Sequence, residues 1–163
     1  MDIKNDIHIM EMNDKLYQRL KQSELVIHAK VESVLRQISS WKYATHEFYV
    51  PAPYQNELAG LPNGRIRKNI EEKDRLKIAG LYSFGFNAEG KILCSQEAPD
   101  NIGNGIITDI YEYDNAFSYY VYHVKYIPNQ YTTIISISYF YPYHEMNIFQ
   151  GINSVSYTHL RAH

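Results

Sequence analysis

Apolar residues recur with helical spacing in the N-terminal part of the chain. Between residues 13 and 39 they stand mostly three, four or seven positions apart, at Leu16, Leu20, Ile27, Val31, Val34, Leu35 and Ile38. On a helix of 3.6 residues per turn these positions form one apolar stripe. Asn13 or Asp14 can cap the start of such a helix. The pattern therefore predicts a long amphipathic helix over residues 13–39, which packs on the remainder of the domain through this stripe.

The stretch after this helix lacks a sustained hydrophobic period. Three prolines and two glycines lie between residues 41 and 64, where they interrupt regular secondary structure. We interpret residues 41–78 as an ordered connection.

The hydrophobic period changes to two from residue 81 onward. Tyr82, Phe84 and Phe86 alternate with small residues, and the residues after them have the composition of a turn. Further strand-like runs are separated by short turns, and they cover residues 106–113, 117–127 and 131–141. Short turns of this kind are typical of an antiparallel meander. We predict an α+β fold in which the helix packs on a β-meander over residues 81–150, within a single domain of residues 1–153.

A three-residue loop at residues 128–130 sets the expected register of the last hairpin, because it makes Ile127 face Tyr131. Odd-numbered residues of both strands then share an apolar face that packs on the helix, and His123 on this face is expected to be a hydrogen-bonded core histidine. The even-numbered face collects tyrosines and hydroxyl groups. We predict that this face is exposed and binds a partner through Glu112, Tyr120, Tyr122, Tyr126, Ser136 and Ser138.

Composition narrows the class of partner. Tyrosine makes up 16 of the 163 residues, and ten of the tyrosines lie between Tyr111 and Tyr143, an enrichment typical of β-structure. The net charge of −2 disfavours nucleic acid, because phosphate binding needs an excess of basic residues. Between residues 79 and 122, six acidic residues stand against a single lysine. This local excess predicts a basic protein as the partner.

No feature of the sequence directs the chain to a membrane or out of the cell. The N-terminus lacks the apolar segment of a signal peptide, and no apolar run approaches the roughly 20 residues of a membrane helix. Cys94 is the single cysteine, so it is expected to be a buried thiol in a reducing compartment. We expect a cytoplasmic protein without membrane contact.

The motifs of common catalytic and metal sites are missing from the sequence, which has no HExxH, CxxC, GxSxG or P-loop. We therefore predict no catalytic residue, no bound metal and no cofactor, and interpret the chain as a binding module rather than an enzyme. The pair His144 and Glu145 leaves a small hydrolase or nuclease as an alternative, because these groups can act as acid and base.

Two resemblances bear on function. Residues 86–92, Phe-Asn-Ala-Glu-Gly-Lys-Ile, resemble the Tyr-Asp-x-x-Gly-Arg-Leu hairpins of YD-repeat (RHS-type) proteins, and residues 111–115 partly repeat the pattern. This resemblance implies a structural fragment of a β-repeat protein with no activity of its own. A single helix ahead of a tyrosine-rich meander also resembles small bacterial immunity proteins, which implies a cationic toxin, such as a nuclease, as the partner. The binding module is the leading interpretation and the repeat fragment is its alternative.

The C-terminal residues resemble a sequence of artificial origin. Val155 to His163 resemble, codon by codon, the translation of an adapter used to prepare sequencing libraries, and Ser154 can belong to the same string. We interpret residues 154–163 as a non-native tail and expect the natural sequence to be cut short near Asn153. The tail is expected to contribute nothing to the fold.

Overall fold

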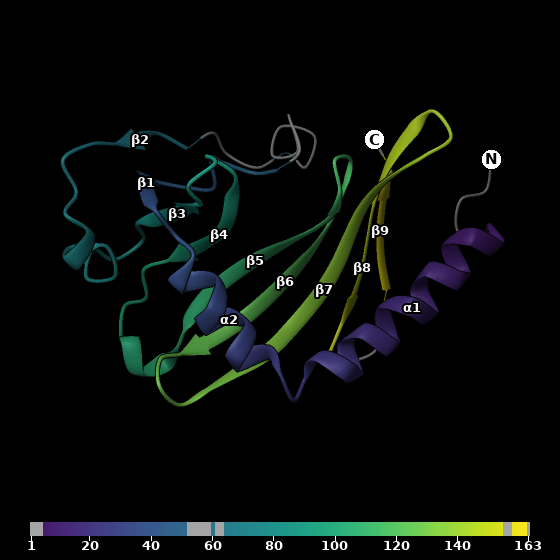
Figure 1. Cartoon of the computed structure of the whole chain (residues 1–163), viewed down its shortest axis with the longest axis horizontal. Coiled ribbons are helices and arrows are strands. Elements are labelled where there is room, and N and C mark those ends of the chain that lie inside the picture. The colour runs from purple at the N-terminus through teal and green to yellow at the C-terminus, as the bar shows by residue number, and fades with distance from the viewer. Residues whose placement is uncertain (1–4, 52–59, 61–63, 155–157, 163) are drawn as a thin grey trace.

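The chain folds into one antiparallel sheet with two helices on one of its faces (Figure 1). The computed structural model describes residues 5–51, 60, 64–154 and 158–162. In these ranges the strands are β1 (Ser40–Ala44), β2 (Ile66–Arg67), β3 (Tyr82–Phe86), β4 (Ile92–Glu97), β5 (Ile106–Asn115), β6 (Ser118–Ile127), β7 (Tyr131–Tyr143), β8 (Met146–Asn153) and β9 (Thr158–Ala162). Their order across the sheet is β2-β1-β3-β4-β5-β6-β7-β8-β9. The α+β class and the antiparallel sheet are confirmed.

The helical region consists of two helices, α1 (Ile7–Ser23) and α2 (Ile27–Arg36). Asp6 caps α1, because its side chain accepts a hydrogen bond of 2.8 Å from the backbone N–H of His8. The prediction of a single helix over residues 13–39 is wrong. A straight helix of that length would extend about 40 Å, whereas the break between Ser23 and Ile27 allows both helices to lie on the sheet, α1 near β7 and β8 and α2 near β4 and β7.

The apolar stripes of both helices belong to one hydrophobic core. Leu16 and Val31 are completely buried in it, and the sheet contributes residues from five of its strands. These sheet residues are Cys94, Ile106, Ile110, Tyr122, Val124, Tyr126, Ile134, Ile137, Tyr139, Tyr141, Ile148 and Ile152. In Figure 1 α2 crosses in front of β5, β6 and β7. Neither described helix has both the length and the apolar composition that spanning a membrane requires.

The opposite face of the sheet carries a second, smaller core. It contains Ala44, Phe84, Phe86, Ile92, Tyr111, Tyr119 and Val121, with Tyr49 from the segment after β1 packed against it. The odd-numbered residues of β6 therefore face away from the helices, and the prediction that they pack on the helix is wrong. The side chains of Tyr122 and Tyr126 pack under the helices instead.

A bulge in β7 changes the register of the last hairpin. The three-residue loop is confirmed, because Ile127 pairs with Tyr131 and the predicted register continues to the pair of Val124 with Ile134. The register then shifts by one residue, so that Val121 pairs with Ser138 rather than with Ile137. A single extra residue reverses the faces of all later side chains in a strand. Ile137 and Tyr139 consequently lie on the helix side, as predicted, but they pair with Tyr122 and Tyr120 rather than with Val121 and Tyr119.

The predicted connection over residues 41–78 also contributes to the sheet. β1 lies between β2 and β3, where it pairs Tyr43 with Arg67 on one side and with Ser83 on the other. Arg75 covers this end of the sheet: its guanidinium lies 3.8 Å from the centre of the Trp41 ring and donates a hydrogen bond to Gln96 Oε1.

Residues 158–162 extend the opposite end of the sheet. They form β9, which pairs antiparallel with β8 from Ile148 opposite Ala162 to Ile152 opposite Thr158. The expectation that residues 154–163 contribute nothing to the fold does not agree with this pairing. An open sheet edge offers unpaired main-chain groups, so it can pair with an extended segment irrespective of that segment's side chains.

Candidate functional site

The six predicted partner-binding residues do not share one surface. Glu112, Tyr120, Tyr122 and Tyr126 lie on the face covered by the helices, in the register that pairs Glu112 with Tyr120. The bulge in β7 places Ser136 beside His123 and Ser138 beside Val121, on the opposite face. Tyr122, Tyr126 and Ser138 are buried, with 1%, 4% and 5% of their surface exposed. The prediction of an exposed even-numbered face is therefore wrong.

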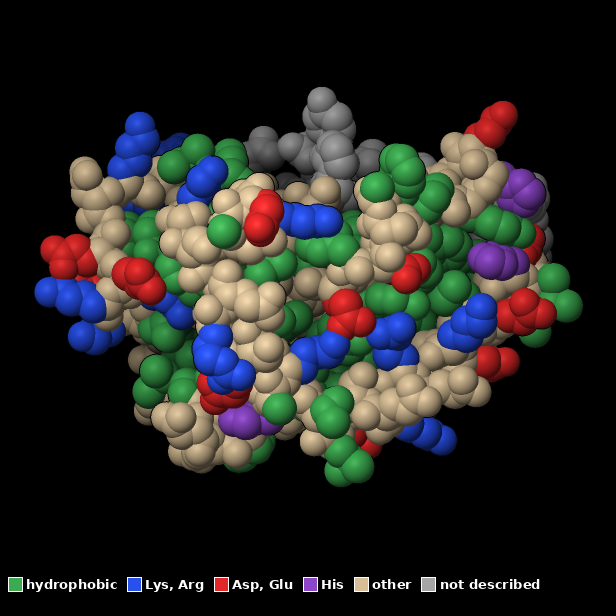
Figure 2. All heavy atoms as spheres, in the orientation of Figure 1, with side chains coloured by type: hydrophobic (Ala, Val, Ile, Leu, Met, Phe, Trp, Pro, Cys, Tyr) green, Lys and Arg blue, Asp and Glu red, His purple; other side chains and the backbone are tan. Residues whose placement is uncertain are grey.

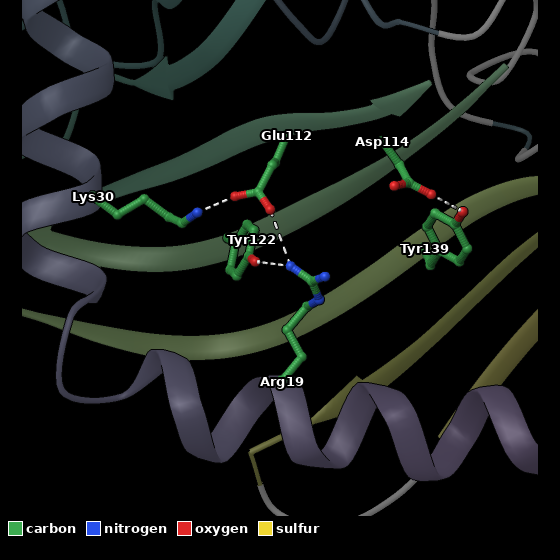
Figure 3. A network of polar contacts seen from close by, with 6 residues as sticks. All are labelled: Arg19, Lys30, Glu112, Asp114, Tyr122 and Tyr139. Carbon is green, nitrogen blue, oxygen red and sulfur yellow. Dashed lines mark hydrogen bonds and ion pairs between the residues drawn. The ribbon is translucent and has the colours of Figure 1, made fainter. Parts of the chain in front are cut away.

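Glu112 belongs to a polar network that joins both helices to the sheet (Figure 3). Arg19 of α1 donates hydrogen bonds of 3.0 Å to Glu112 Oε1 and 2.9 Å to the Tyr122 hydroxyl, and Lys30 of α2 forms an ion pair with Glu112. The Arg19 guanidinium also lies 3.7 Å from the centre of the Tyr120 ring. Two cations of the same chain already pair with the Glu112 carboxylate, so this side chain holds the helices to the sheet rather than a partner.

The network raises the pKa of Arg19. Burial alone would lower the pKa of the guanidinium, but the hydrogen bond to Tyr122 and the neighbouring charges of Tyr120 and Glu112 raise it. Further along the same face, the Tyr139 hydroxyl donates a hydrogen bond of 2.7 Å to Asp114 (Figure 3). Burial and this carboxylate raise the pKa of Tyr139 to about 12. These contacts satisfy the polar groups of a helix–sheet interface, which is a structural role.

A hollow of about 390 Å³ lies beside this network, between the two helices. It is lined by Lys15, Gln18, Arg19, Gln22, Ser23, Val26, Lys30, Tyr120 and Tyr122. Figure 2 shows the helix-covered face, on which basic and acidic side chains are interspersed. The lining of this hollow contains three basic residues and no acidic one, so it does not suit a basic partner.

The opposite face of the sheet carries a hollow of about 280 Å³ with the reverse charge. It is lined by Glu47, Tyr82, Ser95, Glu97, Ile107, Asp109 and His123, and is called the acidic hollow below. Two cross-strand rows build its floor: Tyr82 pairs with Glu97, and Ser95 pairs with Asp109, which pairs in turn with His123. Paired residues of neighbouring strands point to the same face, so these side chains converge.

His123 and Asp109 form a close polar pair in the acidic hollow. Their Nδ1 and Oδ1 atoms are 2.6 Å apart, and the His123 side chain is 38% exposed. The hydrogen bond to Asp109 raises the pKa of His123, helped by the charges of Asp109 and Glu47 and opposed by burial. The predicted hydrogen bond of His123 is thus confirmed, but the residue lines an open hollow instead of lying in a core.

The remaining groups show that negative charge is in excess in the acidic hollow. Burial raises the pKa of Glu47, and the charges of Asp109 and Glu97 raise it further, whereas His123 lowers it. Burial and Glu97 raise the pKa of Tyr82 to about 12. The lining contains no lysine or arginine. An incoming cation would therefore meet three carboxylates and one histidine, which already pairs with Asp109.

Sequence reasoning identified only part of this hollow. Glu97 and Asp109 belong to the acidic stretch that predicted a basic partner, but Glu47 lies in the connection, where no periodic pattern indicates the path of the chain. The pairing of Asp109 with His123 could have been predicted from the sequence, because a hairpin between β5 and β6 brings these two positions together. The face to which they point could not be assigned without the correct register.

The predicted catalytic alternative and the cysteine lie elsewhere. His144 and Glu145 are both exposed in the turn between β7 and β8, where His144 has a φ of 56°, and neither lines the two hollows. Cys94 is completely buried, and burial raises the pKa of its thiol to about 12. Within the described ranges, no group of three or more His, Cys, Asp or Glu side chains is arranged to hold a metal ion.

The pKa of His123 leads to a prediction about stability. Because its folded pKa lies above the ordinary value of 6.5, the stabilisation is fully present below pH 6.5 and is lost as the pH rises through the folded pKa. We expect His123→Gln to lower the free energy of unfolding most between about pH 5 and 6.5, and less at higher pH. Urea denaturation at a series of pH values measures this difference. In an Asp109→Asn background the same substitution should lose this pH dependence, and a difference that grows with pH would contradict the assignment.

Comparison of the chain with protein-family models, with curated proteins and with solved structures finds no match in any of the three.

Proposed function

We propose that this protein is a binding module that holds a basic segment of a protein partner in its acidic hollow. The observation that carries the proposal is the lining, which places Glu47, Glu97 and Asp109 around one concave site without a lysine or arginine. A guanidinium or ammonium group can pair with these carboxylates, and charge-assisted hydrogen bonds to carboxylates are among the strongest polar contacts in proteins. The proposal keeps the class of partner predicted from the sequence and moves its binding surface to the opposite face.

The dimensions of the acidic hollow favour a side chain over a free small molecule. Its volume of about 280 Å³ is at the lower end of ligand pockets, which suits the end of one long basic side chain. Tyr82 and Ser95 also contribute hydroxyl groups to its lining. Acidic surfaces also accelerate association with basic proteins through long-range attraction, an effect that salt weakens.

The kind of partner follows from this chemistry. A cationic toxin, such as a nuclease, presents basic side chains at its surface, so an immunity protein of the bacterial cytoplasm is the biological role we propose. The alternative is a structural fragment of a YD-type repeat protein. In that case the β3–β4 hairpin, in which Asn87 Oδ1 accepts hydrogen bonds from the backbone N–H groups of Glu89 (3.1 Å) and Lys91 (2.8 Å), would serve the fold alone. The two alternatives differ in whether the acidic hollow binds anything.

Binding of a hexa-arginine peptide, measured by isothermal titration calorimetry at low salt, tests the proposal. Glu47→Gln and Glu97→Gln should each weaken binding about fivefold, because each removes one carboxylate that contacts the guanidinium group. Glu89→Gln is the matched control, since it changes the net charge equally at an exposed turn. Equal losses for all three variants would mean that the peptide responds to net charge only, and the proposed site would be wrong.

A further inference from the structure

The two edges of the sheet differ in how they are protected. The β2 edge has only two residues, Ile66 and Arg67, with Arg65 and Lys68 beside them. Short strands and positive charges are common protections against pairing with another chain. At the other end, β8 has eight residues, Met-Asn-Ile-Phe-Gln-Gly-Ile-Asn, with no charged residue and no proline. The β8 edge therefore lacks these protections and needs a strand to cover it.

β8 is fixed in the sheet, because side chains on both of its faces are packed. Ile148 and Ile152 are completely buried in the core beneath the helices. Phe149 packs against the second core on the opposite face. The main-chain groups on the outer edge of β8 thus stay in a fixed, extended row that β9 covers along residues 148–152.

The sequence of β9 indicates that main-chain pairing is sufficient to cover this edge. β9 lies within the string that resembles a translated adapter, and only residues 154–157 connect it to β8. Small residues stand at the two positions in register with the buried isoleucines, Ala162 opposite Ile148 and Thr158 opposite Ile152. Strand addition of this kind derives its affinity from main-chain hydrogen bonds and its preference from alternate side chains.

We propose that the outer edge of β8 is a strand-accepting surface, at which an extended segment of a partner polypeptide takes the place of β9. The fitting segment has at least five residues with free main-chain N–H groups. It carries small or apolar residues at the two positions in register with Ile148 and Ile152. This surface is separate from the acidic hollow and does not depend on the proposed function.

A labelled peptide of residues 154–163 tests the proposal in fluorescence anisotropy. The acceptor is the full chain with His159→Pro and Leu160→Pro, because N–H groups of consecutive strand residues point to opposite sides and one of these two faces β8. The peptide should bind this variant about tenfold more tightly than the wild-type chain, where the tethered β9 competes at high effective concentration. A peptide with the same two prolines should bind neither protein. Equal binding to both proteins, or binding of the proline peptide, would overturn the proposal.

Two measurements keep the test decisive. Circular dichroism shows whether the double-proline chain is folded; if it is not, hydrogen exchange of the wild-type chain replaces it. There, the β8 amides that face β9 should exchange faster than those between β6 and β7, and excess peptide should slow them, whereas an unchanged rate would contradict the proposal. Size-exclusion chromatography detects self-pairing: if the variant forms dimers that the peptide does not dissociate, the edge pairs with a second copy and a partner strand is the wrong occupant.

Discussion

Val31→Asp is expected to unfold the domain or to lower its free energy of unfolding by about 4 kcal/mol, because the new carboxylate has no cationic partner in an apolar core. Val31 belongs to α2 and is completely buried where this helix packs on the sheet. A loss of this size is a large part of the total stability of a small domain. Urea denaturation followed by circular dichroism measures the change.

Ala29→Asp is the matched control for this substitution. It adds the same charge to the same helix at an exposed position in the first turn, where the helix dipole favours an acidic residue. It should leave the free energy of unfolding within about 0.5 kcal/mol of wild type. Equal damage from both variants would show that the buried face of α2 has been assigned incorrectly.

Tyr122→Ala is expected to cost about 3 to 5 kcal/mol, as truncation of a large buried aromatic side chain leaves a cavity. The Tyr122 side chain is 1% exposed in the core beneath the helices, and its hydroxyl accepts a hydrogen bond from Arg19. Tyr122→Phe keeps the ring and removes only that hydrogen bond, so it should cost about 1 kcal/mol. Tyr131→Ala, at a ring that is 55% exposed, should be nearly silent.

Thermal or urea denaturation of these three tyrosine variants distinguishes the observed register from the register predicted from the sequence. Even-numbered positions of β6 would be exposed if the register predicted from the sequence continued along β7, and Tyr122→Ala would then leave stability unchanged. The bulge in β7 and the burial of Tyr122 require the opposite result. A silent Tyr122→Ala would therefore contradict the observed packing of the helices on this face.

The sequence was informative about elements and much less so about faces. The change of hydrophobic period at residue 81 and the short turns are local properties, so the antiparallel meander and the loop at residues 128–130 could be predicted. The bulge within β7 could not, because no glycine or proline marks it in the sequence. Since side chains alternate, one inserted residue was enough to separate Ser136 and Ser138 from Tyr120 and Tyr122.

The helix break and the acidic hollow could not be predicted from the sequence for similar reasons. Apolar positions continue at helical spacing across residues 23–27, so the pattern is the same for one helix as for two. Glu47 reaches the hollow from a segment whose path depends on tertiary contacts such as the packing of Tyr49 on Phe84 and Phe86. The excess of acidic residues was visible in the sequence. The sequence did not show that Glu112 belongs to an internal network whereas Asp109 lines an open site.

Mapping the binding of hexa-arginine by ¹⁵N nuclear magnetic resonance tests the central claim most directly, because it locates the site without substitutions. If the acidic hollow binds basic segments, the largest amide shift changes should occur around Glu47, Glu97, Asp109 and His123, and added salt should reduce them. Changes centred on Glu112 and Tyr120 beneath the helices, or small changes spread over all exposed acidic residues, would contradict the claim.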